Sequence, residues 1–111
     1  AIRIASQLME MTMHSLEHVT FRLVPGTDRA AFLAAARATD PVVRRQPGFQ
    51  SRMLVEGTDG TWGDLVTWAS HADALAAAEA VMSDPGFAPF GAMIDGPTVR
   101  MTHSALVWQV D

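Results

Sequence analysis

The chain has 111 residues, of which 49% are hydrophobic and 18% charged, with a formal net charge of -4 and no cysteine. This length and composition suit one globular domain with its own core and argue against disorder; disulfides and Cys-ligated metals are excluded. The 8 basic residues are all arginines and form no basic stripe, so nucleic acid is not an expected partner.

The first segment, AIRIASQLMEMTM, lacks the apolar region of a signal peptide. No run in the sequence approaches the roughly 20 apolar residues that a membrane helix needs. We therefore interpret residues 1–13 as an N-terminal extension and residues 14–111 as a single domain, with no membrane partner expected. The cytoplasm is the default location, because small secreted domains usually carry disulfides.

The first predicted elements are a strand and a helix. Apolar and polar residues alternate in SLEHVTFRLVPG, which predicts a strand that Pro25-Gly26 ends. Thr27 or Asp28 then caps a helix, and Asp40, followed by Pro41 at a first helical position, is expected to cap a restart of that helix. The helical spacing predicts a buried stripe of Phe32, Ala35, Ala36, Thr39 and Val43.

A hairpin and a second helix follow. FQSRMLVEG and DLVTWA read as two strands joined by a turn at Asp59-Gly60. SHADALAAAEAVMSD predicts an Ala-rich helix that Ser70 caps, with Leu75, Ala78 and Met82 on one face. A short helical turn is expected after Asp84, and TVRMTHSALVWQV reads as the last strand.

The element order is β-α-β-β-α-β, which predicts an α+β domain of the ferredoxin-like type. Its four-stranded antiparallel sheet should have the strand order 4-1-3-2, with both helices on one face. The other face would lie bare, although Trp62, Trp68, Met101 and Trp108 suggest strands that are apolar on both faces. A bare apolar face requires a cover, so a C2 homodimer with its two sheets facing each other is expected.

Three motifs carry a family resemblance that covers residues 14–111: PGF at 47–49, D-x-x-x-W at 64–68 and M-x-H at 101–103. With these motifs the chain resembles the dimeric α+β barrel superfamily, and within it the branch named after antibiotic biosynthesis monooxygenases. The resemblance implies a dimer, a small hydrophobic or aromatic ligand, and for some members oxygenase chemistry without a cofactor. Other members degrade haem with an Asn, a Trp and a His. Trp62, Trp68 and His71 align only loosely with those, and this chain has no Asn.

The alternation of side chains in strands identifies five polar or aromatic residues as candidates for a functional site. Glu17, Asp64 and His103 fall on neighbouring strands and can lie side by side if all three point into the barrel, away from the helices. A histidine between two carboxylates can act as a general acid or base. Trp68 could stack on an aromatic substrate, and Arg52 could reach Asp64 and stabilise a developing anion.

Each of these residues also has a purely structural interpretation. His103 can be a hydrogen-bonded core histidine, Glu17 and Asp64 a buried charge pair or a rim salt bridge, and Arg52 a surface ion pair. Trp68 can belong to the core or the dimer interface. His18 has the opposite parity to Glu17, so only one of the two can face the inside.

Three functions remain open from the sequence. The first is an enzyme, a cofactor-free monooxygenase or isomerase acting on a small aromatic or polyketide-like compound, with His103, Glu17 and Asp64 as catalytic residues and Trp68 and Arg52 binding substrate. The second is a non-catalytic ligand-binding or stress-related barrel protein with a structural His103. The third is an interaction protein whose barrel is filled by Met and Trp side chains. The spacing of His103, Glu17 and Asp64 matches no known metal signature, so no metal and no cofactor are expected.

Overall fold

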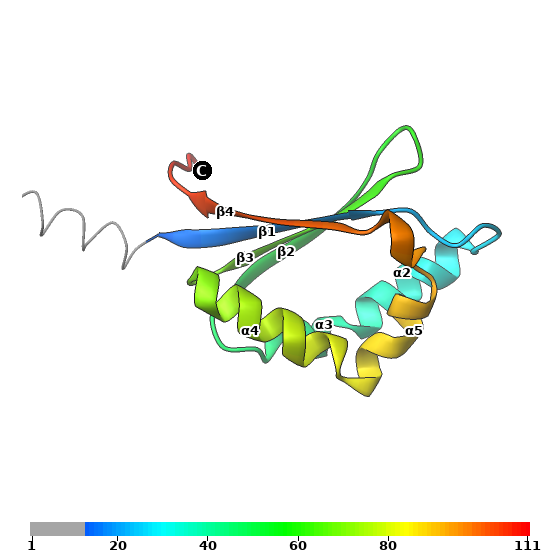
Figure 1. The fold of residues 1–111 in the computed structure, drawn as a ribbon, viewed down its shortest axis with the longest axis horizontal. Coiled ribbons are helices and arrows are strands. Elements are labelled where there is room, and N and C mark those ends of the chain that lie inside the picture. The colour runs from blue at the N-terminus through cyan, green and yellow to red at the C-terminus, as the bar shows by residue number, and fades with distance from the viewer. Residues whose placement is uncertain (1–12) are drawn as a thin grey trace, which may run out of the picture.

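The computed structural model describes residues 13–111, so nearly all of the predicted extension, residues 1–12, lies outside the described residues. The structure has the predicted alternation of strands and helices (Figure 1). The main elements are β1 (His14–Phe21), α2 (Arg29–Ala38), α3 (Asp40–Arg44), β2 (Phe49–Glu56), β3 (Trp62–Trp68), α4 (His71–Met82), α5 (Ala88–Ala92) and β4 (Arg100–Leu106). Two 3₁₀ turns, Pro85–Phe87 and Gly96–Thr98, precede α5 and β4. Within residues 13–111, no helix combines the length and the apolar character that crossing a membrane would require.

Capping residues fix where most helices begin. Asp28 accepts a hydrogen bond from the Ala31 amide, Ser70 from the Asp73 amide and Asp84 from the Gly86 amide, as predicted. The prediction for Asp40 is wrong, because Thr39 holds the cap position of α3 and makes no side-chain cap bond. The carboxylate of Asp40 instead accepts a hydrogen bond from an arginine of the sheet.

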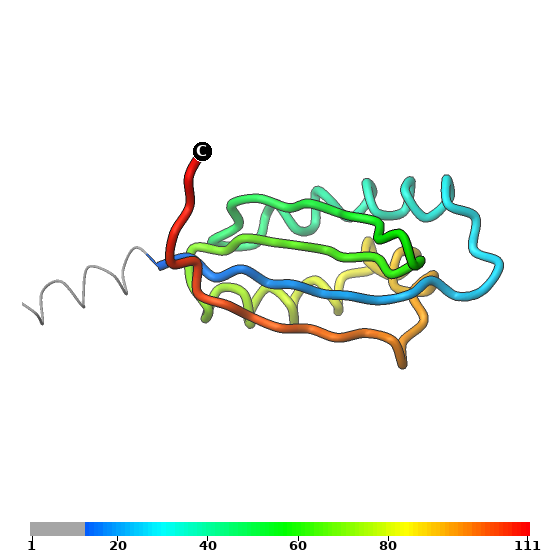
Figure 2. The backbone as a smooth tube through the Cα atoms, turned by 90° about the horizontal axis from the view of Figure 1, so that it is seen from above, coloured from blue at the N-terminus to red at the C-terminus, as the bar shows by residue number. Residues whose placement is uncertain are grey.

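The sheet has the predicted antiparallel strand order, β2-β3-β1-β4 (Figure 2). All the helices cover one face of this sheet (Figure 1). Four residues stand in one line across the strands, because Ala105 pairs with Ser15, Ser15 with Trp68, and Trp68 with Phe49. The last strand is shorter than predicted and ends at Leu106, so Trp108 is not a sheet residue.

Two clusters of buried side chains form the core between the sheet and the helices. The first is mainly aromatic and consists of Phe21, Phe32, Ala36, Trp62 and Phe90. The second consists of Val43, Val66, Trp68, Ala74 and Ala77. Four residues of the predicted helical stripe, Phe32, Ala36, Thr39 and Val43, are buried as expected, and the fifth, Ala35, is half-buried.

The buried face of α4 differs from the prediction. Leu75 and Met82 are 51% and 68% exposed, whereas Ala74 and Ala77 are buried. The run ALAAAEAVM, from Ala74 to Met82, offers hydrophobic residues on nearly every side of the helix, so apolar spacing does not mark its inner face. Small alanine side chains let this helix approach the sheet closely without filling the whole space beneath it.

The sheet face away from the helices is bare within residues 13–111. Alternation places Leu16, His18, Met53, Val55 and Leu65 on it, and both Met53 and Val55 are exposed. A bare face with this apolar content is the one that the predicted dimer would cover. The structure is of one chain and leaves the dimer as a prediction.

Candidate functional site

The candidate site residues lie on the helix side of the sheet, which corrects the sequence-based interpretation. Glu17 pairs with His103 across β1 and β4, and Asp64 stands opposite Val19 and Leu54. All of them share a face with Phe21, Val66 and Trp68 of the core. We expected that face to be packed solid by the helices and placed the polar groups on the opposite one. His18 occupies that opposite, exposed face, which settles its conflict with Glu17.

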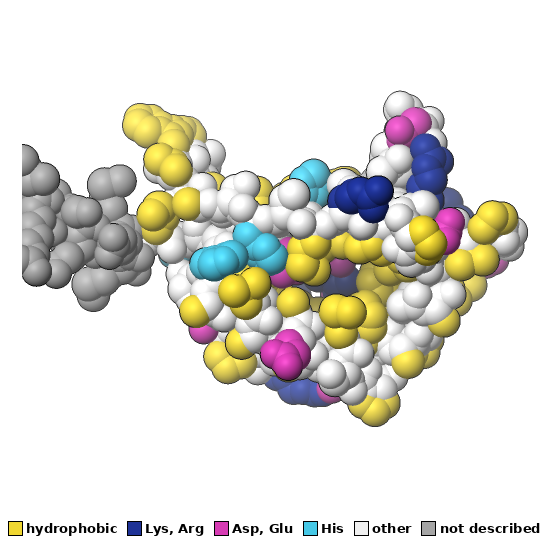
Figure 3. All heavy atoms as spheres, viewed as in Figure 1, with side chains coloured by type: hydrophobic (Ala, Val, Ile, Leu, Met, Phe, Trp, Pro, Cys, Tyr) yellow, Lys and Arg dark blue, Asp and Glu magenta, His cyan; other side chains and the backbone are white. Residues whose placement is uncertain are grey.

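The helices leave a cavity above these residues, here called the inner cavity, with a volume of about 260 Å³. Its walls are mostly apolar, from the sheet, α4, α5 and the segment before β4; the polar side chains among them are those of Glu17, Arg52, Asp64 and Trp68. Figure 3 shows the hollow between the sheet and the helices, with hydrophobic side chains at its rim and acidic ones in its depth. The volume lies just below the usual range for ligand sites, about 300–1,000 Å³, so the cavity suits only a small molecule.

Glu17 and His103 form a buried pair beside this cavity. His103 Nε2 lies 3.1 Å from Glu17 Oε2, and the side chains are only 14% and 10% exposed. Burial raises the pKa of Glu17 above its ordinary value of 4.5 although the bond to His103 opposes this, and the nearby charge of Asp64 raises it further. Glu17 lines the inner cavity, and His103 stands behind it, with its ring in edge-to-face contact with His71 at 5.1 Å.

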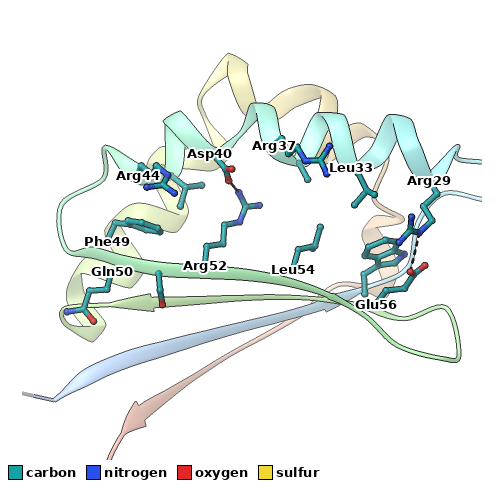
Figure 4. Close-up of a pocket in the computed structure, with 14 residues that line it drawn as sticks. Arg29, Leu33, Arg37, Asp40, Arg44, Phe49, Gln50, Arg52, Leu54 and Glu56 are labelled. Carbon is teal, nitrogen blue, oxygen red and sulfur yellow. Dashed lines mark hydrogen bonds and ion pairs between the residues drawn. The ribbon is translucent and has the colours of Figure 1, made fainter. Parts of the chain in front are cut away.

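Arg52 holds a second buried polar network on the β2–β3 side. Its Nε and Nη2 donate to the two carboxylate oxygens of Asp64, at 3.0 and 2.9 Å. Its Nη1 donates to Thr39 Oγ1 at 2.7 Å. The same nitrogen donates to Asp40 Oδ1 at 3.1 Å (Figure 4). Burial lowers the pKa of Arg52, but the bonds and charges of the two aspartates outweigh this and the net pKa is raised. The guanidinium therefore stays charged and fixed between sheet and helices.

Trp68 carries the one unpaired buried polar side-chain atom among residues 13–111. Its indole Nε1 has no hydrogen-bond acceptor, and the residue is 2% exposed. A buried donor left without an acceptor costs about 1–3 kcal/mol. Trp68 also lines the inner cavity, so a bound molecule or a water there is the natural source of an acceptor.

The sequence analysis missed the roof of the inner cavity. Phe87, Phe90, Gly91 and Ile94 come from the segment after α4 and line it. The guanidinium of Arg52 also lies over the Phe90 ring, with its central carbon 5.7 Å from the centre of the ring. The sequence signal was the apolar run FAPFGAMI after the Asp84 cap, which we interpreted only as a helical turn.

A second hollow, here called the outer groove, lies between α2, α3 and the edge strand β2 and has a volume of about 650 Å³ (Figure 4). It shares Arg52 and Val43 with the inner cavity but opens on a different side. Sequence reasoning did not predict it. No group of three or more His, Asp or Glu side chains in residues 13–111 is arranged to hold a metal ion.

The fold matches those of solved proteins over most of their length. The chain is 20% identical to SnoaB, a cofactor-independent oxygenase from Streptomyces nogalater, with 89% of this chain and 96% of that one covered and a TM-score of 0.57. A candidate antibiotic biosynthesis monooxygenase from Bordetella bronchiseptica matches with 15% identity, 83% and 95% coverage and a TM-score of 0.72. A protein of unknown function from Nitrosomonas europaea matches with 17% identity, 90% and 95% coverage and a TM-score of 0.66.

No protein-family model and no curated protein matches the chain. The structural matches confirm the predicted ferredoxin-like α+β fold. They also confirm the predicted likeness of this fold to that of antibiotic biosynthesis monooxygenase-like proteins. A shared fold hosts many activities, so the function has to be argued from the site itself.

Proposed function

We propose that this protein is a homodimeric, cofactor-independent enzyme of the monooxygenase kind that oxidises a small aromatic or polyketide-like compound in its inner cavity. The observation that carries the proposal is Glu17, a buried carboxyl group in the wall of a mostly apolar cavity, with a raised pKa and a histidine bonded behind it. The likeness of the fold to that of SnoaB, an oxygenase that needs no cofactor, supports the same reading.

In this proposal Glu17 transfers the proton, and His103 holds the Glu17 side chain in position. A carboxyl group with a raised pKa is a stronger base than an ordinary glutamate when ionised, and it remains able to return a proton. His103 fixes the orientation of Glu17 through its Nε2 and balances the charge when the carboxylate forms. This exchanges the roles that the sequence suggested, because Glu17 and not His103 lines the cavity.

The remaining polar groups would bind the substrate. The Trp68 ring offers an apolar wall, and its unpaired N–H would donate to a substrate oxygen that reaches it. The guanidinium of Arg52 supplies positive charge beside the cavity, while Asp64 keeps that guanidinium in place. Asp64 and Asp40 balance that positive charge, so the group free to stabilise negative charge on a bound phenol or enol is the Trp68 N–H, a fixed donor in a water-poor site.

The reaction balances without an added reductant for a methylene group that neighbouring phenol or carbonyl groups acidify. Glu17 removes one C–H proton, the carbanion reacts with O₂ to form a C–O bond, and the peroxide takes a proton. Loss of the second C–H proton breaks the O–O bond, leaving a ketone and water. The carbon gives up four electrons and O₂ accepts four, so one oxygen atom enters the product and one enters water.

Oxygen uptake with a panel of small phenols, hydroquinones and acidic aryl methylene compounds tests the proposal. We expect the wild type to consume O₂ with one class, and ¹⁸O₂ to leave one labelled atom in the product. Glu17→Gln should lose this activity, while His18→Ala, on the bare face of the same strand, should keep it. Compounds that raise the melting temperature of the wild type without any O₂ uptake would instead identify a binding protein, the alternative left open by the sequence.

A further inference from the structure

The segment that follows β4, residues 107–111 with the sequence VWQVD, is apolar yet uncovered. Val107, Trp108 and Val110 are 75%, 81% and 79% exposed. The segment leaves the sheet on the side away from the helices (Figure 1). Among residues 13–111, the side chain of its acidic residue, Asp111, has a hydrogen bond only from Gln109 of the same segment and no ion pair. A tryptophan this exposed on a chain with a well-formed core calls for a partner surface.

The outer groove complements this segment: its floor is apolar, as the segment is, and its rim carries arginines, whereas the segment carries an acidic residue. Leu33, Phe49, Leu54 and Trp62 line it with apolar surface. Two of its four arginines are already paired, Arg29 with Glu56 and Arg52 with Asp40 and Asp64.

Arg37 and Arg44 also line the groove (Figure 4) and have no acidic partner within residues 13–111. Arg44 lies over the Phe49 ring, 5.9 Å from its centre. The outer groove therefore suits a short apolar segment that carries negative charge, which describes residues 107–111.

The groove and the segment of one chain cannot meet. β4 and β2 are the opposite edges of the sheet, with β1 and β3 between them. That separation is three strand spacings, about 14 Å, and the groove opens on the helix side whereas the segment leaves on the bare side. Five extended residues span only about 17 Å, too little to cross the sheet and then pass around its edge.

A second copy removes this obstacle. If two bare faces pack together about a two-fold axis along the strands, β4 of one copy lies over β2 of the other. The line from Ala105 through Ser15 and Trp68 to Phe49 then places the end of β4 above the Phe49 end of the partner groove. The segment then has to cross only the gap between the sheets, about 10 Å, and the edge of β2, which together remain within the roughly 17 Å that five extended residues span.

We propose that residues 107–111 of each copy dock in the outer groove of the other copy, with Trp108 on its apolar floor and Asp111 near its unpaired arginines. This proposal rests on the proposed homodimer but not on the oxygenase chemistry. Each copy would thereby cover the groove wall of its partner, which includes Arg52, a residue shared with the inner cavity.

Site-directed disulfide formation tests the proposal cleanly, because the chain has no cysteine. Trp108→Cys protein and Gln50→Cys protein are mixed and oxidised gently; Gln50 lies beside Phe49 in the outer groove. We expect a covalent dimer that contains one chain of each variant. Ser83→Cys, at the far end of α4, replaces Gln50→Cys as the control and should give none.

Sedimentation of the wild type and of two variants separates the possible results. Trp108→Ala, and Arg37→Glu combined with Arg44→Glu, should each weaken dimerisation; for the tryptophan we expect about 30-fold or more. A wild-type monomer would overturn both the dimer and the docking. A stable dimer without the mixed disulfide, or with an unchanged dissociation constant in both variants, would overturn the docking alone. Tight binding of the aromatic anion 8-anilinonaphthalene-1-sulfonate to a wild-type groove, lost in the Arg37 and Arg44 variant, would also show the groove to be open and the docking wrong.

Discussion

The two buried charge pairs on the helix side of the sheet differ in how completely they are satisfied. Arg52 uses three nitrogen atoms on three partners, and its carboxylate partner Asp64 is held by both oxygens. Glu17 has one bond, to His103, and its pKa is raised because burial outweighs that bond. The first pair fastens the sheet to the helix layer, and the second keeps a proton available at the cavity wall.

Removal of the arginine should have the largest effect on stability. Arg52→Met leaves Asp64 buried without its cation and should lower the free energy of unfolding by about 3–5 kcal/mol in urea titrations. Arg29→Met is the matched control, because the Arg29–Glu56 pair is exposed and its loss should cost about 1 kcal/mol at most. Equal losses in the two variants would mean that Arg52 does not fasten the layers.

Replacing Glu17 by a neutral side chain should lower the rate of the proposed reaction rather than the stability of the fold. Glu17→Gln keeps the size of the side chain and a hydrogen bond to His103, so the variant should fold. Oxygen consumption should fall at least about 100-fold, equal to about 2.7 kcal/mol in activation free energy. If the variant retains full activity with a substrate of the wild type, Glu17 is not the base.

The tryptophan of the inner cavity should affect ligand affinity more than stability. Trp68→Phe removes the unpaired N–H and keeps an aromatic ring, so loss of packing and relief of the orphan donor offset each other. We expect the dissociation constant of a bound ligand to rise about tenfold, the value of one hydrogen bond. Trp62→Phe, at a residue of the aromatic cluster that does not line the inner cavity, should leave that constant unchanged; calorimetric titration of both variants decides.

The smallest effect concerns the pH dependence of stability. Because the folded pKa of Glu17 lies above its ordinary value of 4.5, the folded state binds more protons than the unfolded state in the window that begins near that value. The contribution of Glu17 to stability therefore decreases as the pH rises through this window. Melting curves of Glu17→Gln should lack this part of the decrease, and identical pH profiles for wild type and variant would contradict the raised pKa.

The strands, their order and most helix caps could be predicted because they depend on local signals. Alternation in β1 and a side-chain oxygen at Asp28, Ser70 and Asp84 specify them without knowledge of the rest of the chain. The pairing of Arg52 with Asp64 and of His103 with Glu17 also followed, since strand order and parity place those side chains on one face.

The side of the sheet on which the site lies could not be predicted. Parity groups Glu17 with His103 but is the same for either face, and we assumed that the helices fill their side completely. That assumption failed at α4, where Ala74 and Ala77 form the inner face and leave room for the inner cavity. Asp40 was read as a cap because its partner, Arg52, is distant in sequence.

The core is divided, and the inner cavity touches both parts: Phe21 and Phe90 of the aromatic cluster on one side, Val66 and Trp68 on the other. A molecule in the cavity would contact both clusters at once and join them. Ligand binding should therefore slow amide hydrogen exchange in β1 and β3, well beyond the residues in contact with the ligand, and make the two halves open together.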